Sequence, residues 1–182
     1  MVDTHWTNEA KELCGEYPNI QTFSDNFGKN EMPSIIGNVD AIILFDVLLH
    51  QVAPDWDRIL QMYSPYTDFF IIVNPQFIGS PVTVRLIDLG YEGYFNNTPY
   101  NDKEYPTFKN LFEKMYEIHP VHNRIWRDVH HPWQWGITDK DLIFKMYELG
   151  FKLVYLKHDG IWGGLSNWEN NVFVFKKVNK EK

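Results

Sequence analysis

The sequence has little of three features that define common classes of protein. Its single cysteine, Cys14, excludes an internal disulfide and is typical of a reducing cytoplasm. A formal net charge of −7 leaves no basic surplus for sequence-independent nucleic-acid binding, so we expect no nucleic-acid partner. We find neither a signal peptide nor an apolar run long enough to cross a membrane, and therefore expect a cytoplasmic protein without a membrane partner.

Aromatic residues, in contrast, are abundant, with seven Trp, ten Tyr and thirteen Phe. Such residues mostly fill a core or line a pocket, and they also form sites for ring-bearing or sugar ligands. At 182 residues the chain is long enough to bury a sizeable core. We expect a single domain over residues 1–182.

Three consecutive segments predict a strand, a helix and a second strand. Residues 41–45 are apolar without alternation, which is typical of a strand buried on both faces of a parallel sheet. Asp55 is an expected N-cap of the helix, and Phe69–Val73 is a second buried run. Asp46 directly follows the first strand. Polar residues at the carboxyl ends of parallel strands are where such sheets bind ligands.

The rest of the chain gives weaker signals, apart from one helix near its end. That helix begins at Thr138 or Asp139 and stops at Gly150, a residue suited to a helix C-terminus. The other expected elements are helices over Thr7–Glu16 and Thr107–Ile118, strands over Asn19–Ser24, Val82–Leu89, Phe151–Leu156 and Asn171–Lys177, and loops over Gly28–Asn38 and Gly90–Pro106.

The segments Asp40–His50, Asp55–Leu60 and Phe69–Pro75 resemble the fourth and fifth strands of class I S-adenosylmethionine-dependent methyltransferases. Trp135–Phe151 and Asn170–Lys177 resemble the family's final helix and last two strands. The resemblance implies an α/β fold with a Rossmann-like sheet, mostly parallel with an antiparallel C-terminal strand pair. It covers about the C-terminal two-thirds of a family domain.

The same resemblance implies S-adenosylmethionine as cofactor. Asp3 matches the carboxylate that binds the ribose hydroxyls, and Asp25, followed by Asn26, matches an acidic residue near the adenine. Phe45 and Asp46 would line the methionine or ribose side. The purely structural alternatives are a frayed terminus for Asp3, a turn former for Asp25 and a helix cap for Asp46.

The family's first strand, glycine-rich turn and first helix have no counterpart, since no Gly-x-Gly-x-x-Gly occurs in the sequence. We therefore expect a truncated domain in which unaided cofactor binding is impaired. It would be a fragment of a longer enzyme, a chain completed by a partner, or a rebuilt sheet without catalysis. Loss of the central strand predicts a homodimer or a second chain that supplies the missing strand.

Residues 76–138 form a long insertion with few regular signals, which we assign to a lid that selects the substrate. His130 or His131 is a candidate general base, and His50 would also face the acceptor. Arg124 and Arg127 would clamp a carboxylate or phosphate. Trp133 and Trp135 would form apolar walls of the same site.

Two alternatives apply to this insertion. A metal site would use His119, His122, His130 and His131, but their spacing matches no standard zinc pattern and we expect no metal. The structural alternative is an Arg–Asp pair and packed tryptophans that close the lid over the sheet.

The sequence thus predicts methyl transfer from S-adenosylmethionine to a small-molecule or sugar acceptor. A non-catalytic relative that serves as a binding or partner subunit is the second hypothesis. An aromatic-lined carbohydrate binder is a third.

Overall fold

A computed structural model describes residues 1–4, 6–100, 111–129, 132–161 and 164–178 of the chain. The backbone divides into two compact units, Met1–Asn38 and Val39–Lys182.

The first unit contains two short parallel strands, β1 (Val2–Asp3) and β2 (Phe23–Ser24). Helix α1 (Asn8–Gly15) confirms the expected helix, and Thr7 caps it by accepting a hydrogen bond from the backbone nitrogen of Ala10. The expected loop over residues 28–38 is wrong in part, because helix α2 (Met32–Ile36) forms there. Its second residue is a proline, which fits the first turn of a helix.

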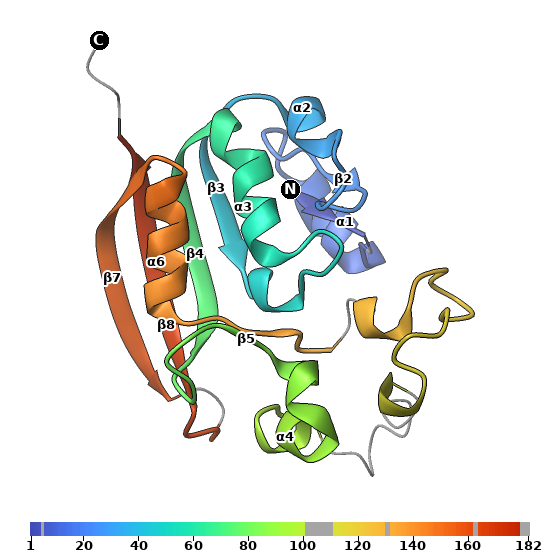
Figure 1. Cartoon of the computed structure of the whole chain (residues 1–182). Coiled ribbons are helices and arrows are strands. Elements are labelled where there is room, and N and C mark those ends of the chain that lie inside the picture. The colour runs from blue at the N-terminus through green and yellow to red at the C-terminus, as the bar shows by residue number, and fades with distance from the viewer. Residues whose placement is uncertain (5, 101–110, 130–131, 162–163, 179–182) are drawn as a thin grey trace. The chain divides into compact units, whose positions relative to one another are not determined.

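The second unit is built on a four-stranded sheet with the order β3-β4-β8-β7 (Figure 1). The strands are β3 (Val39–Phe45), β4 (Thr67–Phe77), β7 (Phe151–Ile161) and β8 (Trp168–Lys177). Strands β3 and β4 are parallel, whereas β8 is antiparallel to both β4 and β7. The sheet is therefore mixed. Its C-terminal strand pair is antiparallel, as expected, whereas a mostly parallel sheet is not confirmed.

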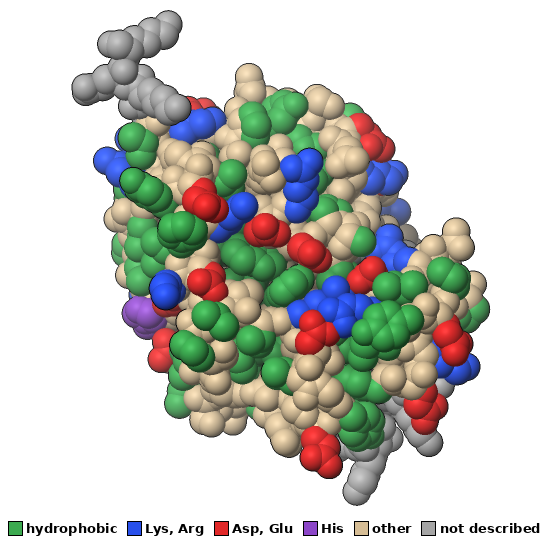
Figure 2. Space-filling model, viewed as in Figure 1, with side chains coloured by type: hydrophobic (Ala, Val, Ile, Leu, Met, Phe, Trp, Pro, Cys, Tyr) green, Lys and Arg blue, Asp and Glu red, His purple; other side chains and the backbone are tan. Residues whose placement is uncertain are grey.

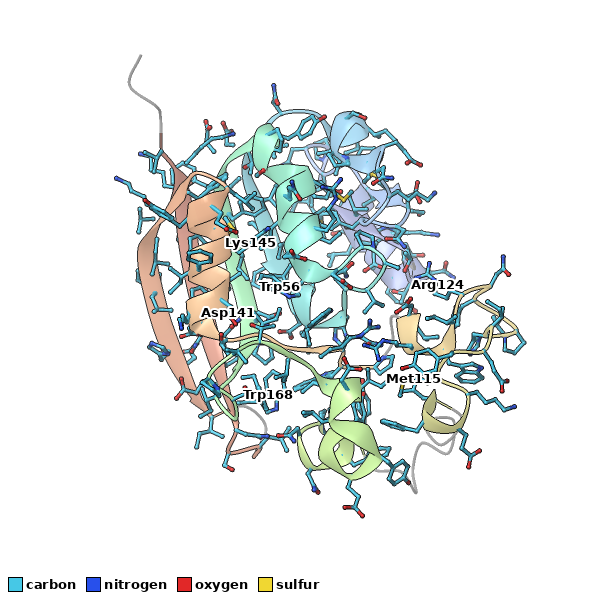
Figure 3. The ribbon with its side chains drawn as sticks, viewed as in Figure 1. Trp56, Met115, Arg124, Asp141, Lys145 and Trp168 are labelled. Atoms are coloured by element: carbon cyan, nitrogen blue, oxygen red, sulfur yellow. The ribbon has the colours of Figure 1, made fainter. Side chains whose placement is uncertain are left out.

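Helices α3 (Trp56–Tyr63) and α6 (Asp139–Glu148) lie side by side on one face of this sheet (Figure 1). Each buries two apolar residues or more in the core, among them Ile59 of α3 and Met146 of α6. Lys145 of α6 reaches toward α3, where its Nζ atom lies 3.6 Å from Oδ2 of Asp57 (Figure 3). Two amphipathic helices thus cover the same face of the sheet.

Strand β3 differs from its prediction in one respect. Ile42 and Leu44 are buried, whereas Ile43 and Phe45 are 54% and 64% exposed. Side chains alternate between the two faces of a strand, so one face of β3 packs in the core and the other is open. The apolar run was correctly interpreted as a strand, but it is not buried on both faces.

The segment between β4 and α6 contains short elements. They are β5 (Val84–Arg85), 3-10 helix η3 (Leu86–Leu89), helix α4 (Gly90–Asn96), 3-10 helix η4 (Trp126–Asp128) and β6 (Trp135–Gly136), which pairs antiparallel with β5. The expected strand over residues 82–89 is thus shortened to β5, and α4 replaces part of the expected loop over residues 90–106. Of the helix expected over residues 107–118, residues 107–110 lie outside the described residues. Residues 111–113 are helical, and residues 114–118 are not.

Aromatic side chains give this segment a core of its own. Trp168 and Tyr94 are fully buried, and Phe77 and Trp133 are nearly so. The ring centroid of Trp168 lies 4.9 Å from that of Phe77 and 4.7 Å from that of Trp133. Trp168 therefore joins the end of the sheet to the inserted segment (Figure 3). The abundance of aromatic residues is explained in large part by this cluster.

Helix α6 depends on its N-cap. The backbone nitrogen of Asp141 donates a hydrogen bond to Oγ1 of Thr138 at 3.3 Å, as the sequence predicted. We expect Thr138→Ala to lower the free energy of unfolding by about 1 kcal/mol, because the first turn loses an acceptor. Urea denaturation would measure the loss, and Ser166→Ala, at an exposed position, is the control. Equal stability of the two variants would contradict the role of Thr138.

Candidate functional site

The carboxyl ends of β1 and β2 bring together the acidic residues predicted in the first unit. Asp3 pairs with Ser24, and the backbone nitrogen of Asp25 donates to the carbonyl oxygen of Asp3 at 3.0 Å. Asp25 also forms an ion pair with Lys29 at 2.6 Å, and this contact lowers the pKa of its carboxyl. Its Oδ1 atom accepts from the backbone nitrogen of Asn26 at 2.7 Å. The result is a compact edge of carboxylates and amides.

In the second unit, β3 ends at Phe45 and Asp46. Asp46 has a left-handed backbone with a φ of 50°, and its nitrogen donates to the carbonyl oxygen of Val73 at 2.9 Å. Burial raises the pKa of its carboxyl, and the nearby His50 opposes the rise. Nδ1 of His50 lies 3.1 Å from the carbonyl oxygen of Pro132. Because a carbonyl can only accept, Nδ1 carries the proton and Nε2 is the basic nitrogen.

Two polar residues at the end of β4 were not singled out from the sequence. Asn74 and Gln76 are completely buried. Oδ1 of Asn74 and both polar side-chain atoms of Gln76 have no hydrogen-bond partner among the described residues. Their signal in the sequence is the change from the apolar run Phe69–Val73 to alternating amides within one strand.

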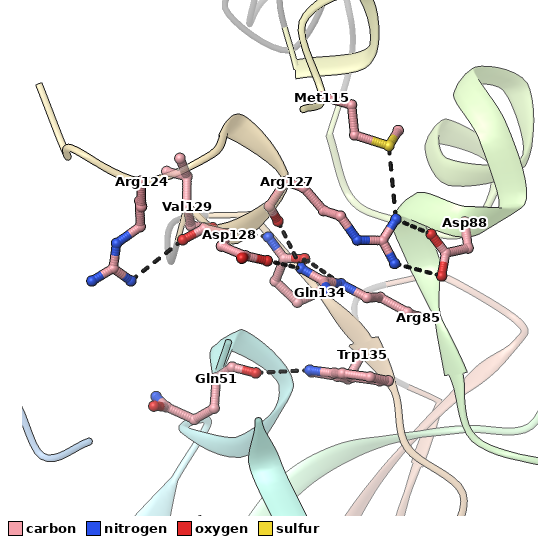
Figure 4. A network of polar contacts seen from close by, with 10 residues as sticks. All are labelled: Gln51, Arg85, Asp88, Met115, Arg124, Arg127, Asp128, Val129, Gln134 and Trp135. Carbon is pink, nitrogen blue, oxygen red and sulfur yellow. Dashed lines mark hydrogen bonds and ion pairs between the residues drawn. The ribbon is translucent and has the colours of Figure 1, made fainter. Parts of the chain in front are cut away.

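The predicted arginines lie in a network of polar contacts within the inserted segment (Figure 4). Arg127 binds both carboxylate oxygens of Asp88, with Nη2 2.7 Å from Oδ2, and its Nη1 lies 3.7 Å from Sδ of Met115. Nη1 of Arg124 donates to the backbone oxygen of Asp128 at 3.4 Å. Arg127 thus already holds a carboxylate, which is supplied by this chain.

Arg85 is the centre of the network, although no pattern in the sequence indicates it. Its Nη2 atom donates to Oδ1 of Asp128 at 2.7 Å and to the carbonyl oxygen of Arg127 at 2.8 Å. It also lies 3.4 Å from Oε1 of Gln134. Burial raises the pKa of the neighbouring Asp55, and the charge of Arg85 opposes this rise. Arg85 therefore ties β5 to η4 and to the strand that leads into α6.

The two predicted tryptophans have different surroundings. Trp133 is buried in the aromatic core of the segment. Nε1 of Trp135 donates to the carbonyl oxygen of Gln51 at 2.7 Å, and its ring lies 5.7 Å from Cζ of Arg85. Figure 2 shows basic side chains beside acidic and hydrophobic ones near the middle of that view. Trp135 thus ties β6 to Gln51 and to Arg85, and a role of the two tryptophans in substrate binding stays a prediction.

The predicted bases His130 and His131 lie outside the described residues. The described part of the chain contains no group of three or more His, Cys, Asp or Glu side chains arranged to hold a metal ion. Its helices are also all too short or too polar to span a membrane.

The solved structures that are similar to this chain include the following three. The first is a 1,6-didemethyltoxoflavin-N1-methyltransferase from Burkholderia thailandensis with bound 1,6-didemethyltoxoflavin and S-adenosylhomocysteine. Its TM-score is 0.57 at 11% identity, and the match covers 98% of this chain and 60% of that one. The N-terminal domain of EvdMO1 with bound SAH has a TM-score of 0.52 and 11% identity over 93% of this chain and 59% of that one. A methyltransferase from Methanosarcina mazei has a TM-score of 0.53 and 11% identity, with coverage of 97% of this chain and 80% of that one.

This chain therefore spans 59% and 60% of the length of two of these structures. No protein-family model and no curated protein matches its sequence. The likeness concerns the path of the backbone, and it agrees with the strand, helix and strand pattern that the sequence predicted. The chain has the α/β fold of class I S-adenosylmethionine-dependent methyltransferases.

Proposed function

We propose that this chain takes part in methyl transfer from S-adenosylmethionine to a small-molecule acceptor. The observation that carries the proposal is the similarity of its fold to a methyltransferase structure with bound S-adenosylhomocysteine and to the N-terminal domain of EvdMO1 with bound SAH. Polar residues at the carboxyl ends of β1, β2 and β3 support it, since α/β sheets bind ligands there.

The residues present fit the nucleoside of this cofactor. Asp3 and Asp25 meet at one sheet edge, where carboxylates can accept hydrogen bonds from ribose hydroxyls and from the adenine amino group. Asn26 adds an amide at the same edge, although its Oδ1 already accepts from the backbone nitrogen of Gly28. Phe45 and Asp46 would contact the methionine or ribose side. The bound cofactor supplies an electrophilic methyl group.

The chain's own residues would orient the acceptor and remove its proton. In the tautomer fixed by Pro132, Nε2 of His50 is suited to act as a general base. We assign the insertion over residues 76–138 to acceptor binding, with Arg124, Arg127, Trp133 and Trp135 as contacts and His130 or His131 as an additional base. We also propose that a homodimer or a second chain completes the sheet.

A second candidate is a non-catalytic binding or partner subunit with the same fold. The sequence contains no Gly-x-Gly-x-x-Gly turn, and Asp25 and Arg127 are both engaged by side chains of this chain. Engaged side chains stabilise a fold whether or not it catalyses a reaction. This candidate predicts a folded protein without affinity for the cofactor.

Calorimetric titration with S-adenosylhomocysteine separates the two candidates. We expect binding by the wild-type chain and at least about tenfold weaker binding by Asp3→Ala, because a hydrogen bond to a charged group contributes about 1.5–3 kcal/mol. Asp40→Ala, at an exposed position on β3, is the control and should bind as the wild type does. A folded sample that releases no heat of binding would favour the non-catalytic subunit.

A further inference from the structure

The candidate base His50 is held against the segment that precedes β6. It lies in 3-10 helix η1 (Leu48–His50), shortly after the end of β3. The carbonyl oxygen of Leu49 accepts a hydrogen bond from the backbone nitrogen of Gln134 at 2.9 Å. Nδ1 of His50 lies 3.1 Å from the carbonyl oxygen of Pro132. The position of the Pro132 carbonyl therefore decides which ring nitrogen of His50 carries the proton.

Gln134 holds this segment at both ends. It is only 1% exposed, and its backbone carbonyl oxygen accepts from the nitrogen of Leu86 at 2.8 Å, in addition to the contact with Leu49. Its side-chain Nε2 atom donates to the carbonyl oxygen of Val129 at 2.8 Å. Val129 precedes Pro132 in the chain and Gln134 follows it. One buried side chain thus joins the two ends of the segment that contains the Pro132 carbonyl.

Arg85 sets the orientation of the Gln134 amide (Figure 4). Nε and Nη2 of Arg85 each donate to Oε1 of Gln134 at 3.4 Å. A guanidinium can only donate, so the amide oxygen faces Arg85 and the amide nitrogen is left for Val129. Arg85 is itself fixed by Asp128, whose Oδ1 atom lies 2.7 Å from Nη2. A continuous series of contacts therefore runs from Asp128 to the amide of Gln134.

The contact between His50 and Pro132 is sensitive to this arrangement. A distance of 3.1 Å is near the long end of the usual range, so a displacement of about half an ångström would break the bond. Leucine at position 134 has no amide, and the carbonyl oxygen of Val129 would lose its donor. Once the bond to Pro132 is lost, Nδ1 is no longer favoured as the site of the proton. A proton on Nε2 blocks the nitrogen that would act as the base.

We propose that Gln134 is a positioning residue, which keeps Nε2 of His50 unprotonated by holding the carbonyl of Pro132 in place. This inference rests on the proposed methyl transfer for the role of His50 as a base, whereas the tautomer of His50 can be measured without the cofactor. If Gln134 only stabilised the insertion, its replacement would lower the stability of the chain and leave the tautomer unchanged.

Long-range 1H–15N NMR of the labelled full chain tests the proposal at about pH 8.5, above the ordinary histidine pKa of about 6.5. The His50→Gln variant identifies the signals of His50. We expect the wild type to carry the proton on Nδ1. In Gln134→Leu the ratio of the two neutral tautomers should move toward protonated Nε2 by at least about threefold, as befits the loss of one neutral hydrogen bond.

Two further variants separate positioning from stability. Gln134→Glu is milder, because it keeps an acceptor for Arg85 and loses only the donor to Val129, so it should shift the ratio in the same direction and gives the test if Gln134→Leu does not fold. Phe151→Leu is the control. It changes a buried ring in β7, at the opposite edge of the sheet from β3, and should lower stability without changing the tautomer.

Three results would overturn the inference. They are a wild-type His50 protonated on Nε2, an unchanged ratio in the folded Gln134 variants, and an equal shift in Phe151→Leu. Titration of the wild type with S-adenosylhomocysteine keeps the two proposals apart. Cofactor binding with an unchanged ratio in the Gln134 variants overturns this inference alone, and the expected shift without cofactor binding overturns the proposed methyl transfer alone.

Discussion

Trp168→Ala is expected to lower the free energy of unfolding by about 3–5 kcal/mol, since it leaves a large cavity in the core. The Trp168 side chain is fully buried between Phe77 and Trp133. Its Nε1 atom donates to the carbonyl oxygen of Asn97 at 2.8 Å. Truncation therefore removes both the ring that joins the insertion to the sheet and a buried hydrogen bond.

Urea denaturation followed by circular dichroism would measure the change caused by Trp168→Ala. Trp168→Phe keeps a ring at the position and should lose less. Tyr116→Ala is the control, because Tyr116 is 75% exposed, and a change within about 0.5 kcal/mol is expected there. A loss below about 1 kcal/mol for Trp168→Ala would show that the aromatic cluster does not support the fold.

Arg85→Met is expected to lower the free energy of unfolding by about 2–3 kcal/mol. The side chains of Arg85 and Asp128 are 13% and 25% exposed, so solvent screens their ion pair only in part. Methionine fills much of the same space but leaves the Asp128 carboxylate without its cation. It also removes a donor from Gln134 and from the carbonyl oxygen of Arg127.

Thermal and urea unfolding of Arg85→Met should be compared with those of Arg58→Met, whose guanidinium contacts Gln61 on the surface. The surface variant should be nearly as stable as the wild type. Adding Asp128→Asn to Arg85→Met should recover part of the loss, because the uncompensated charge is then removed. If the double variant is no more stable than Arg85→Met alone, the loss comes from packing and not from the uncompensated charge.

The sequence determined the regular elements of the fold most clearly where one physical signal dominated. The apolar run of β3 and the capped helix from Thr138 to Gly150 both formed as predicted. The inserted segment was harder, because its core consists of aromatic side chains brought together from distant positions. The helix at residues 90–96 begins at a glycine and is stabilised by the burial of Tyr94, so tertiary packing overrides its weak local preference.

The candidate site was predictable to the extent that it follows strand ends. Asp3, Asp25 and Asp46 all lie at such ends, as the sequence indicated. Arg85 was missed because its partners, Asp128 and Gln134, are more than 40 residues away in the chain. Gln76 was missed for a different reason. Whether a buried amide is satisfied depends on its neighbours in space, and a pattern of residues along the chain does not contain that information.

The alternating exposure of β3 has a consequence for how its alignment is set. A strand that is apolar on both faces gains nearly as much from a pairing shifted by one residue, so hydrophobicity alone does not select its register. The left-handed backbone of Asp46 and its hydrogen bond to Val73 stop the strand at a defined point. The carboxylate that we place near the cofactor is thus carried by the residue that also locks β3 against slipping along β4.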